Sequence, residues 1–124
     1  MKLRIRGNSL RIRLTKTEVD AFGKDGHIEE QTSFINGTLS YVLQSYDGEH
    51  MSATIFGNKI TMQIPAALAK EWVETNKVGY EYNQSLPDGN TLYLLLEKDF
   101  KCLDENITED QSDSYDNPLI THKH

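Results

Sequence analysis

Residues 7–14 of this chain recur at residues 57–64, and this internal repeat constrains the fold more than any other feature. The first segment reads Gly-Asn-Ser-Leu-Arg-Ile-Arg-Leu and the second reads Gly-Asn-Lys-Ile-Thr-Met-Gln-Ile. The match continues at the same offset of 50 residues, where Phe22 aligns with Trp72. Because internal repetition fixes the architecture of a chain, we predict two copies of one strand–turn–strand–helix–hairpin unit.

Polar and apolar side chains alternate through the first two predicted strands, residues 2–6 and 10–14. Successive side chains of a strand point to opposite faces of the sheet. The apolar set, which includes Leu3 and Ile5, is therefore expected to face a core. The opposite surface, which we call the basic face, consists of Lys2, Arg4, Arg6, Arg11 and Arg13.

Local signals place a helix and a hairpin after these strands. Thr15 followed by Glu18 fits the capping box, in which each side chain accepts a hydrogen bond from a backbone amide of the other residue. Gly23 is a plausible end of that helix. Residues 28–34 read as a third strand, and Asn36-Gly37 is a strong hairpin signal.

The second copy repeats this order. Pro65 stands at the start of a helix over residues 66–73, where its missing amide donor is harmless. Ile28 of the first copy aligns with Val78 of the second, which predicts the equivalent third strand. Residues 91–97 are the most apolar strand of the chain. The predicted fold is mainly β with two short helices, an α+β chain with pseudo-two-fold symmetry.

The length of 124 residues suits one domain built from both copies. A unit of about 50 residues is marginal alone, because small chains bury a low fraction of their surface. We therefore predict a single domain over residues 1–103, with repeat one at 1–47 and repeat two at 51–100. An acidic tail follows at residues 104–124.

Charge is spread unevenly along the chain, whose formal net charge is −6. The basic face lies near the start, whereas residues 104–120 carry six acids and no base. The six are Asp104, Glu105, Glu109, Asp110, Asp113 and Asp116. Such a composition favours a solvated segment, because it offers little apolar surface to bury. The acidic tail could also fold over the basic face and mask it, with an attraction that salt weakens.

The repeated pattern resembles the AbrB/MazE-like swapped-hairpin family. The resemblance covers residues 2–46 and again 51–100, and it rests on the Gly-Asn turn with its alternating strand and, in the second copy, on Pro65-Ala66-Ala67-Leu68. It implies a barrel made of two fused repeats. The whole chain also resembles a small uncharacterised bacterial family, in the Gly-Asn-Ser-Leu turn and in the segment from Glu97 to Leu103.

The swapped-hairpin resemblance carries implications for function. In that family the basic strands bind DNA, which here would be the work of the basic face. Acidic extensions bind a toxin partner, which would assign partner binding to Glu109, Asp110, Asp113 and Asp116. The second copy departs from the basic pattern, since its matching positions hold Ser52, Thr54, Phe56, Thr61 and Gln63.

No motif of an enzyme is present: the sequence lacks a Walker loop, Gly-x-Ser-x-Gly, His-Glu-x-x-His and paired zinc-binding cysteines. We read His27 and His50 as loop residues and Cys102, the only cysteine, as a small apolar residue. The tail carboxylates could hold a hard cation, and His122 with His124 could bind zinc weakly. An ordinary acidic tail is the simpler interpretation, and no cofactor or metal site is expected.

We therefore predict a non-enzymatic binding module that uses the basic face to bind DNA or RNA, or that acts as a regulatory protein. The alternative is an antitoxin-like interaction module whose acidic tail engages a basic protein. A third reading is a merely solvated sheet face. Phe22 and Trp72 are expected to plug the core, although stacking on a ligand stays open. The single cysteine and the lack of a long apolar run indicate a cytoplasmic protein without membrane contact.

Overall fold

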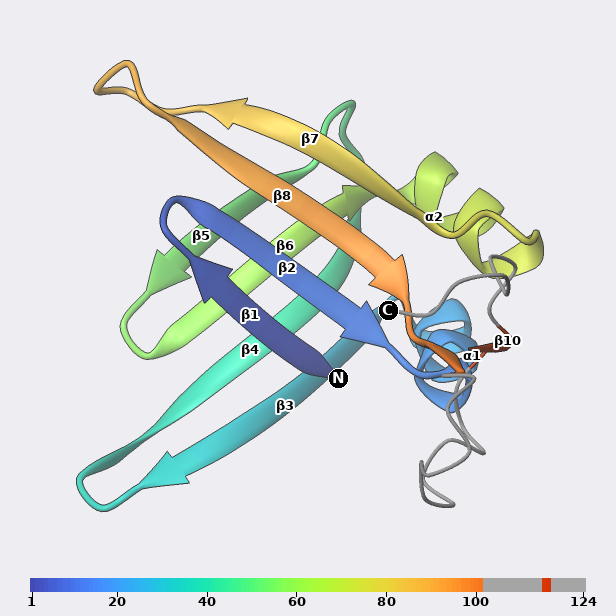
Figure 1. Cartoon of the computed structure of the whole chain (residues 1–124), viewed down its shortest axis with the longest axis horizontal. Coiled ribbons are helices and arrows are strands. Elements are labelled where there is room, and N and C mark those ends of the chain that lie inside the picture. The colour runs from blue at the N-terminus through green and yellow to red at the C-terminus, as the bar shows by residue number, and fades with distance from the viewer. Residues whose placement is uncertain (102–114, 117–124) are drawn as a thin grey trace.

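The computed structural model describes residues 1–101 and 115–116. It contains two helices and two four-stranded sheets, with a short two-stranded pairing near the end (Figure 1). The helices are α1 (Lys16–Asp25) and α2 (Ala66–Glu74). The strands are β1 (Lys2–Arg6), β2 (Ser9–Leu14), β3 (His27–Phe34), β4 (Gly37–Tyr46), β5 (Ser52–Phe56), β6 (Lys59–Pro65), β7 (Gly79–Ser85), β8 (Thr91–Lys98), β9 (Phe100–Lys101) and β10 (Tyr115–Asp116).

Each four-stranded sheet combines one hairpin from each repeat. Sheet A has the order β1-β2-β8-β7 and sheet B has the order β3-β4-β6-β5. In both sheets the two hairpins join through a central parallel pair, β2 with β8 and β4 with β6. Neither repeat can therefore complete a sheet alone, which accounts for a single domain built from both.

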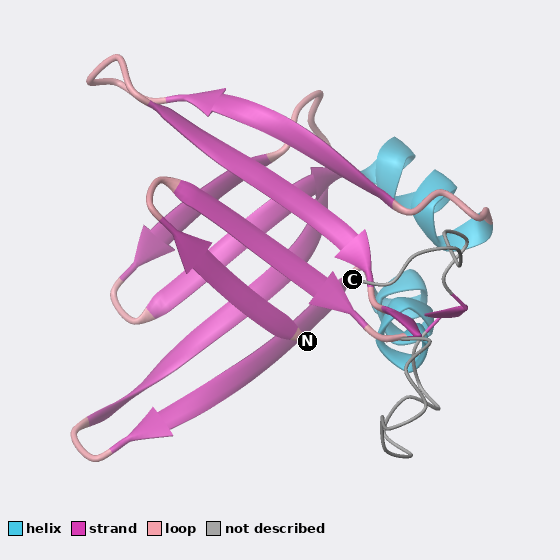
Figure 2. Cartoon of the chain, viewed as in Figure 1, coloured by secondary structure: helices cyan, strands magenta, loops and turns pink. Residues whose placement is uncertain are grey.

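The two sheets face each other, and both helices lie at the same end of this pair of layers (Figure 2). The turns of the four long hairpins lie at the opposite end (Figure 1). The expectation of a mainly β chain with two short helices is confirmed. The expected closed barrel is not formed by the described strands, because β1, β7, β3 and β5 are sheet edges with no ladder to the other sheet.

Apolar side chains from both repeats fill the space between the sheets and the helices. The buried core consists of Leu10, Ile12, Leu14, Val19, Phe22, Leu43, Met51, Ile60, Met62, Ile64, Ala69, Trp72, Leu94 and Leu96. Phe22 and Trp72 meet edge to face with ring centroids 6.2 Å apart. Their expected role as core plugs is confirmed, since both rings are almost fully buried.

The capping box at the start of α1 is confirmed. The Glu18 amide donates to Thr15 Oγ1 at 3.3 Å, and the Thr15 amide donates to Glu18 Oε1 at 2.9 Å. The expected helix end at Gly23 is wrong, because α1 continues to Asp25 and Gly26 takes the left-handed conformation with φ of 68°. Gly23 instead permits close helix packing: an added Cβ would lie 2.7 Å from a methyl group of Val73.

Strand register also corrects the alignment of the third strands. Ser9 pairs with Tyr93 in sheet A, as Lys59 pairs with Ser40 in sheet B. When the β3–β4 and β7–β8 ladders are superimposed on that basis, the counterpart of Ile28 is Tyr80 rather than Val78. The second copy has therefore gained two residues between its helix and its third strand.

Ile5 lies on the same side of its strand as Leu3, as expected, but it is not buried in the core. Leu3 packs against the core, but Ile5 is 59% exposed and its counterpart Ile55 is 69% exposed. Both lie next to the hairpin turns, at the end of the sheets opposite the two helices (Figure 1). Alternation predicted the correct side of the strand, but it could not show where the covering elements end.

Gly79 provides a test of the β7–β8 ladder. A Cβ added there would lie 2.0 Å from the backbone oxygen of Leu96, which cannot move aside without disturbing β8. We expect Gly79→Ala to lower the free energy of unfolding by about 1–3 kcal/mol, the usual cost of overpacking. Gly37→Ala is the matched control, because an added Cβ meets nothing within 4 Å there. Equal effects of both changes in urea unfolding would contradict the register.

Candidate nucleic-acid interface

The basic face is assembled as the sequence predicts, on the outer surface of sheet A. Lys2 pairs with Arg13 and Arg4 pairs with Arg11, while Arg6 lies opposite Ser9. These residues alternate with the inward-facing Leu10, Ile12 and Leu14. Two of the three cross-strand positions therefore place like charges directly opposite each other, an arrangement that destabilises a sheet. These pairs also create a cationic surface on sheet A.

Acidic side chains from β8 and its end neutralise one side of the basic face. Glu97 Oε1 lies 3.5 Å from Arg11 Nε and 3.1 Å from Arg13 Nη2. Asp99 carboxylate oxygens lie 3.3 Å from Lys2 Nζ and 3.8 Å from Arg13 Nη1. Sequence reasoning missed this pairing, because parallel contact between β2 and β8 joins residues that are more than 80 positions apart.

Arg4 and Arg6 are the cations that remain available. Within the described part of the chain, neither guanidinium has an ion pair, and both residues are exposed. They stand on the edge strand β1, away from the carboxylates of β8. A guanidinium offers several donors in a planar fork that suits phosphate oxygens. The free end of the basic face is thus equipped to bind an anion.

A hollow of about 120 Å³ opens between these two arginines and β8. Its lining residues are Arg4, Arg6, Ser9, Leu10, Arg11 and Tyr93. The Tyr93 hydroxyl donates to Glu81, and this hydrogen bond, together with desolvation, raises the pKa of Tyr93. The phenol therefore stays neutral near pH 7 and adds no negative charge to the basic face. This hollow, which we call the cationic hollow, has a size that suits one phosphate group better than a drug-sized ligand.

The matching hairpin of sheet B, β5–β6, has neutral residues at the positions of the basic face. Ser52 Oγ donates to Gln63 Oε1 at 3.0 Å, in the place of the Lys2–Arg13 pair. Thr54 pairs with Thr61 in the place of the Arg4–Arg11 pair. Because this hairpin forms with neutral residues at the positions that match the four arginines, strand pairing does not require the arginines of sheet A.

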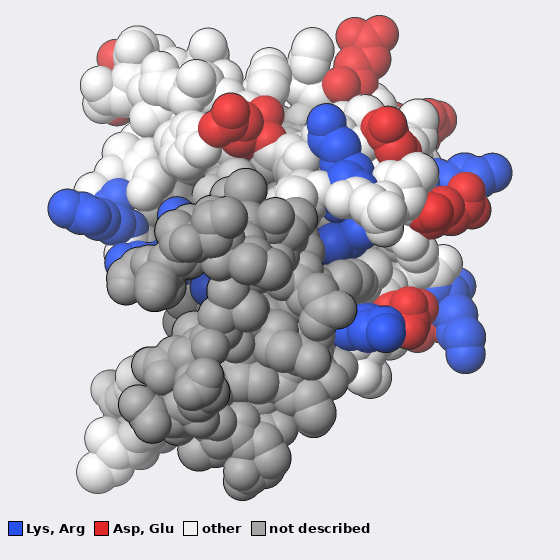
Figure 3. All heavy atoms as spheres, turned by 45° about the vertical axis from the view of Figure 1, so that its right-hand side comes forward, with Lys and Arg blue, Asp and Glu red and all other residues white. Residues whose placement is uncertain are grey.

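The surface view agrees with an uneven distribution of charge. Figure 3 shows a group of basic side chains at the left, whereas basic and acidic side chains are interspersed at the right. Among the described residues, the basic face forms its ion pairs with Glu97 and Asp99 alone. A field of one sign raises the local concentration of a polyanion and steers its approach.

The candidate partner-binding acids lie largely beyond the described residues. Glu109, Asp110 and Asp113 fall in the range 102–114, and His122 and His124 also lie outside the description, as does Cys102. Asp116 belongs to β10, which pairs in parallel with β9 and places Asp116 beside Lys101 in the ladder. The acidic segment thus returns to the end of β8 at residues 115–116.

The two histidines have structural contacts. His27, expected in a loop, is the first residue of β3, where its Nδ1 lies 2.7 Å from Gln44 Oε1. His50 stacks on Tyr82 with centroids 5.1 Å apart. In residues 1–101 and 115–116, no three His, Cys, Asp or Glu residues gather as metal ligands would.

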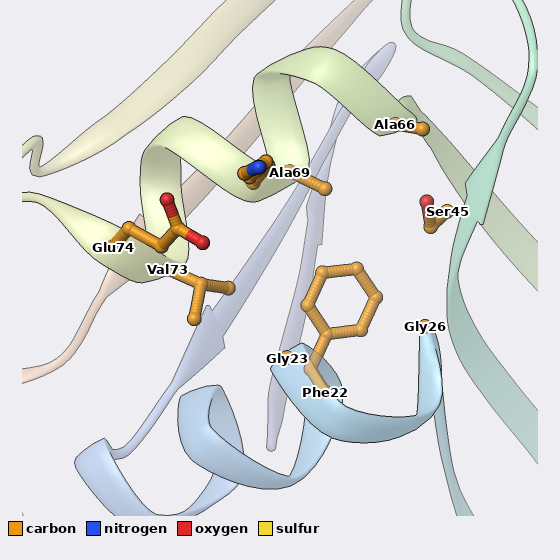
Figure 4. A pocket seen from close by; sticks show the side chains of 9 residues that line it. Phe22, Gly23, Gly26, Ser45, Ala66, Ala69, Val73 and Glu74 are labelled. Carbon is orange, nitrogen blue, oxygen red and sulfur yellow. The ribbon is translucent and has the colours of Figure 1, made fainter.

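Another hollow, of about 280 Å³, lies between the two helices and the end of β4 (Figure 4). The Phe22 ring forms its wall, and small residues such as Gly23, Ala66 and Ala69 line the rest. Lys70 and Glu74 are its only charged lining residues. Such a hollow, with small side chains and two opposite surface charges, is an ordinary result of packing two short helices. We therefore assign no chemistry to this hollow.

A family model supplies the relationship of this chain to other proteins. The model of a family of unknown function, DUF7009, matches residues 1–119. The chain belongs to the DUF7009 family. No curated protein and no solved structure matches the chain. Within the described range, neither helix has the length and apolar content needed to cross a membrane.

Proposed function

We propose that this DUF7009 chain binds nucleic acid through the basic face of sheet A. The ligand is the phosphodiester backbone, contacted first by Arg4 and Arg6 and then by Arg11. Basic side chains release counterions when they contact phosphates, so the interaction would depend strongly on salt and little on sequence. Strands rather than a helix would make the contacts, as in β-ribbon readers.

The comparison between the two repeats supports this proposal most directly. Positions that hold Arg4, Arg6, Arg11 and Arg13 in sheet A hold Thr54, Phe56, Thr61 and Gln63 in sheet B. The two hairpins share one backbone arrangement, so the charges are an addition to the fold rather than a condition for it. A solvated face would need no such concentration of like charge on directly opposed positions.

Amide chemical-shift mapping tests where the ligand binds. Labelled protein is titrated with short random-sequence single-stranded RNA, single-stranded DNA and duplex DNA. We expect the largest shifts in β1 and β2, with few in β5 and β6, and the order of the three affinities identifies the preferred form. Shifts centred on sheet B, or none with any of the three ligands, would contradict the proposal.

Glu97 and Asp99 should weaken nucleic-acid binding, because they form ion pairs with Lys2, Arg11 and Arg13 that compete with phosphate. We expect the isosteric double change Glu97→Gln/Asp99→Asn to raise affinity for an oligonucleotide several-fold, up to about tenfold, in low salt. Fluorescence anisotropy measures this change.

The control for that experiment is Glu29→Gln/Glu49→Gln, which alters the net charge by the same amount away from sheet A. This control is expected to change affinity much less than Glu97→Gln/Asp99→Asn. Equal gains would show that only the net charge matters, and a loss of affinity in the first variant would show that the carboxylates hold the binding geometry.

We propose as a second function an antitoxin-like interaction module, in which the acidic tail binds the partner. Six acids between residues 104 and 120 would engage a basic protein, and the same acids could compete with nucleic acid for the basic face. The relationship to the AbrB/MazE-like swapped-hairpin family and a cytoplasmic location belong to this set of proposals. A basic protein that co-purifies with the full chain and is lost after removal of residues 104–124 would support it. Unchanged oligonucleotide affinity after the same truncation would exclude competition by the tail.

A further inference from the structure

The end of the molecule opposite the helices carries an apolar hollow of about 320 Å³ between the two sheets. Its lining residues are Ile5, Gly7, Asn8, Ser9, Leu10, Ala53, Thr54, Ile55, Ile60, Leu86 and Leu92. Ile5 pairs with Leu10 in sheet A, and their counterparts Ile55 and Ile60 pair in sheet B. The two turns therefore form opposed apolar walls around the pseudo-two-fold axis. Phe22 and Trp72 close the other end, whereas the described residues that line this hollow include no aromatic side chain.

Specific hydrogen bonds hold the walls of this apolar hollow in place. Asn8 Nδ2 donates to the Thr91 oxygen at 2.7 Å, and the Tyr93 amide donates to the Asn8 oxygen at 3.0 Å. Across the sheets, the Ala53 amide donates to Gln84 Oε1 at 2.9 Å. The hollow is thus largely preformed, as small-molecule sites usually are, and its volume lies at the lower end of their range.

The apolar hollow adjoins the cationic hollow. Both are lined by Ser9 and Leu10, so they are neighbours at the β1–β2 hairpin. Arg6 immediately follows Ile5 in β1 and precedes Gly7, where an added Cβ would meet nothing within 4 Å. An apolar site and an exposed cation are therefore neighbours around an open turn.

We propose that this end of the molecule binds a free amphiphile with one acyl chain and an anionic head group. The acyl chain occupies the apolar hollow between Ile5 and Ile55, and the head group pairs with Arg6 and Arg4. The structure favours an aliphatic chain over a nucleobase, because leucine and isoleucine line the hollow and its described lining has no aromatic side chain for stacking. The guanidinium groups exclude a cationic head. This proposal does not rest on nucleic-acid binding.

Calorimetric titration with dodecanoate, below its micelle-forming concentration, tests the proposal on the full chain. We expect saturable binding of dodecanoate, weaker binding of dodecanol and none of dodecyltrimethylammonium. Butyrate keeps the carboxylate but lacks most of the chain, and it should bind at least about tenfold more weakly than dodecanoate. Equal binding of all four compounds, or binding only to phosphatidylglycerol vesicles and not to the monomer, would overturn the proposal.

Three variants assign the site. Ile5→Ser/Ile55→Ser changes exposed residues that the core does not need, and it should weaken dodecanoate binding at least about tenfold. Phe56→Ser is the control, since Phe56 is 86% exposed but does not line the hollow. The isoleucine variant should keep its affinity for oligonucleotides. Arg4→Gln/Arg6→Gln should weaken the binding of both dodecanoate and oligonucleotides. Unchanged dodecanoate binding in the isoleucine variant would overturn the assignment even if oligonucleotide binding is intact.

Discussion

Trp72→Ala is expected to lower the free energy of unfolding by about 3–5 kcal/mol, the usual cost of emptying a large aromatic site in a core. Trp72 is fully buried, and its ring meets Phe22 edge to face at 6.2 Å. Its Nε1 also donates to the Val78 oxygen at 2.9 Å, which fixes the chain between α2 and β7. Truncation would leave a cavity where the two repeats join. It would also remove one of the two donors of the Val78 oxygen, which accepts from the Lys98 amide at 3.0 Å as well.

Urea unfolding followed by circular dichroism measures this change. Trp72→Phe separates the two contributions, because it retains most of the ring but not the hydrogen bond. We expect its cost to be smaller than that of alanine, at about 1–3 kcal/mol. A shift below about 1 kcal/mol for Trp72→Ala would show that the ring does not hold the two repeats together.

Arg4→Gln/Arg6→Gln is expected to reduce affinity for an oligonucleotide by about ten- to a hundredfold at low salt. These two guanidinium groups have no ion pair among the described residues, so the substitutions remove no ion pair there from the free protein. Stability should change by less than about 1 kcal/mol, because exposed substitutions away from special features have small effects. Removing like charges near Arg11 could even stabilise the hairpin slightly.

The matched control is Thr54→Glu/Phe56→Glu at the equivalent positions of sheet B. Both double variants make the net charge more negative by two, but only the first alters the basic face. We expect the control to keep its affinity within about threefold, since its added charges lie on the other sheet. Equal losses in the two variants would show that the net charge, rather than this surface, governs binding.

The repeat made the order of elements predictable, because the same local signals occur twice. The capping box of Thr15 and Glu18, the Asn36-Gly37 hairpin and the alternation around Ile12 each follow from neighbours in sequence. The basic face was predictable for the same reason: its residues belong to two adjacent strands joined by a tight turn. Burial of Phe22 and Trp72 followed from their matching positions on two amphipathic helices.

The remaining features depend on contacts between distant segments. No local pattern shows that β2 lies beside β8, and this pairing brings Glu97 to Arg11 and Arg13. The exposure of Ile5 depends on its place beside the β1–β2 turn, because both described helices pack at the opposite end of the sheets. The open sheets in place of a barrel likewise depend on whether edge strands such as β1 and β7 meet, which hairpin signals cannot determine.

The salt dependence of binding tests the role of the basic face most directly. Anisotropy of a labelled random-sequence oligonucleotide is titrated with wild-type protein and with Arg4→Gln/Arg6→Gln at several salt concentrations between about 50 and 200 mM. We expect the logarithm of the association constant to fall linearly with the logarithm of salt for the wild type. The slope should be smaller by about two in the variant, one unit for each lost phosphate contact. Identical slopes, or no binding by the wild type at the lowest salt, would contradict nucleic-acid recognition by sheet A.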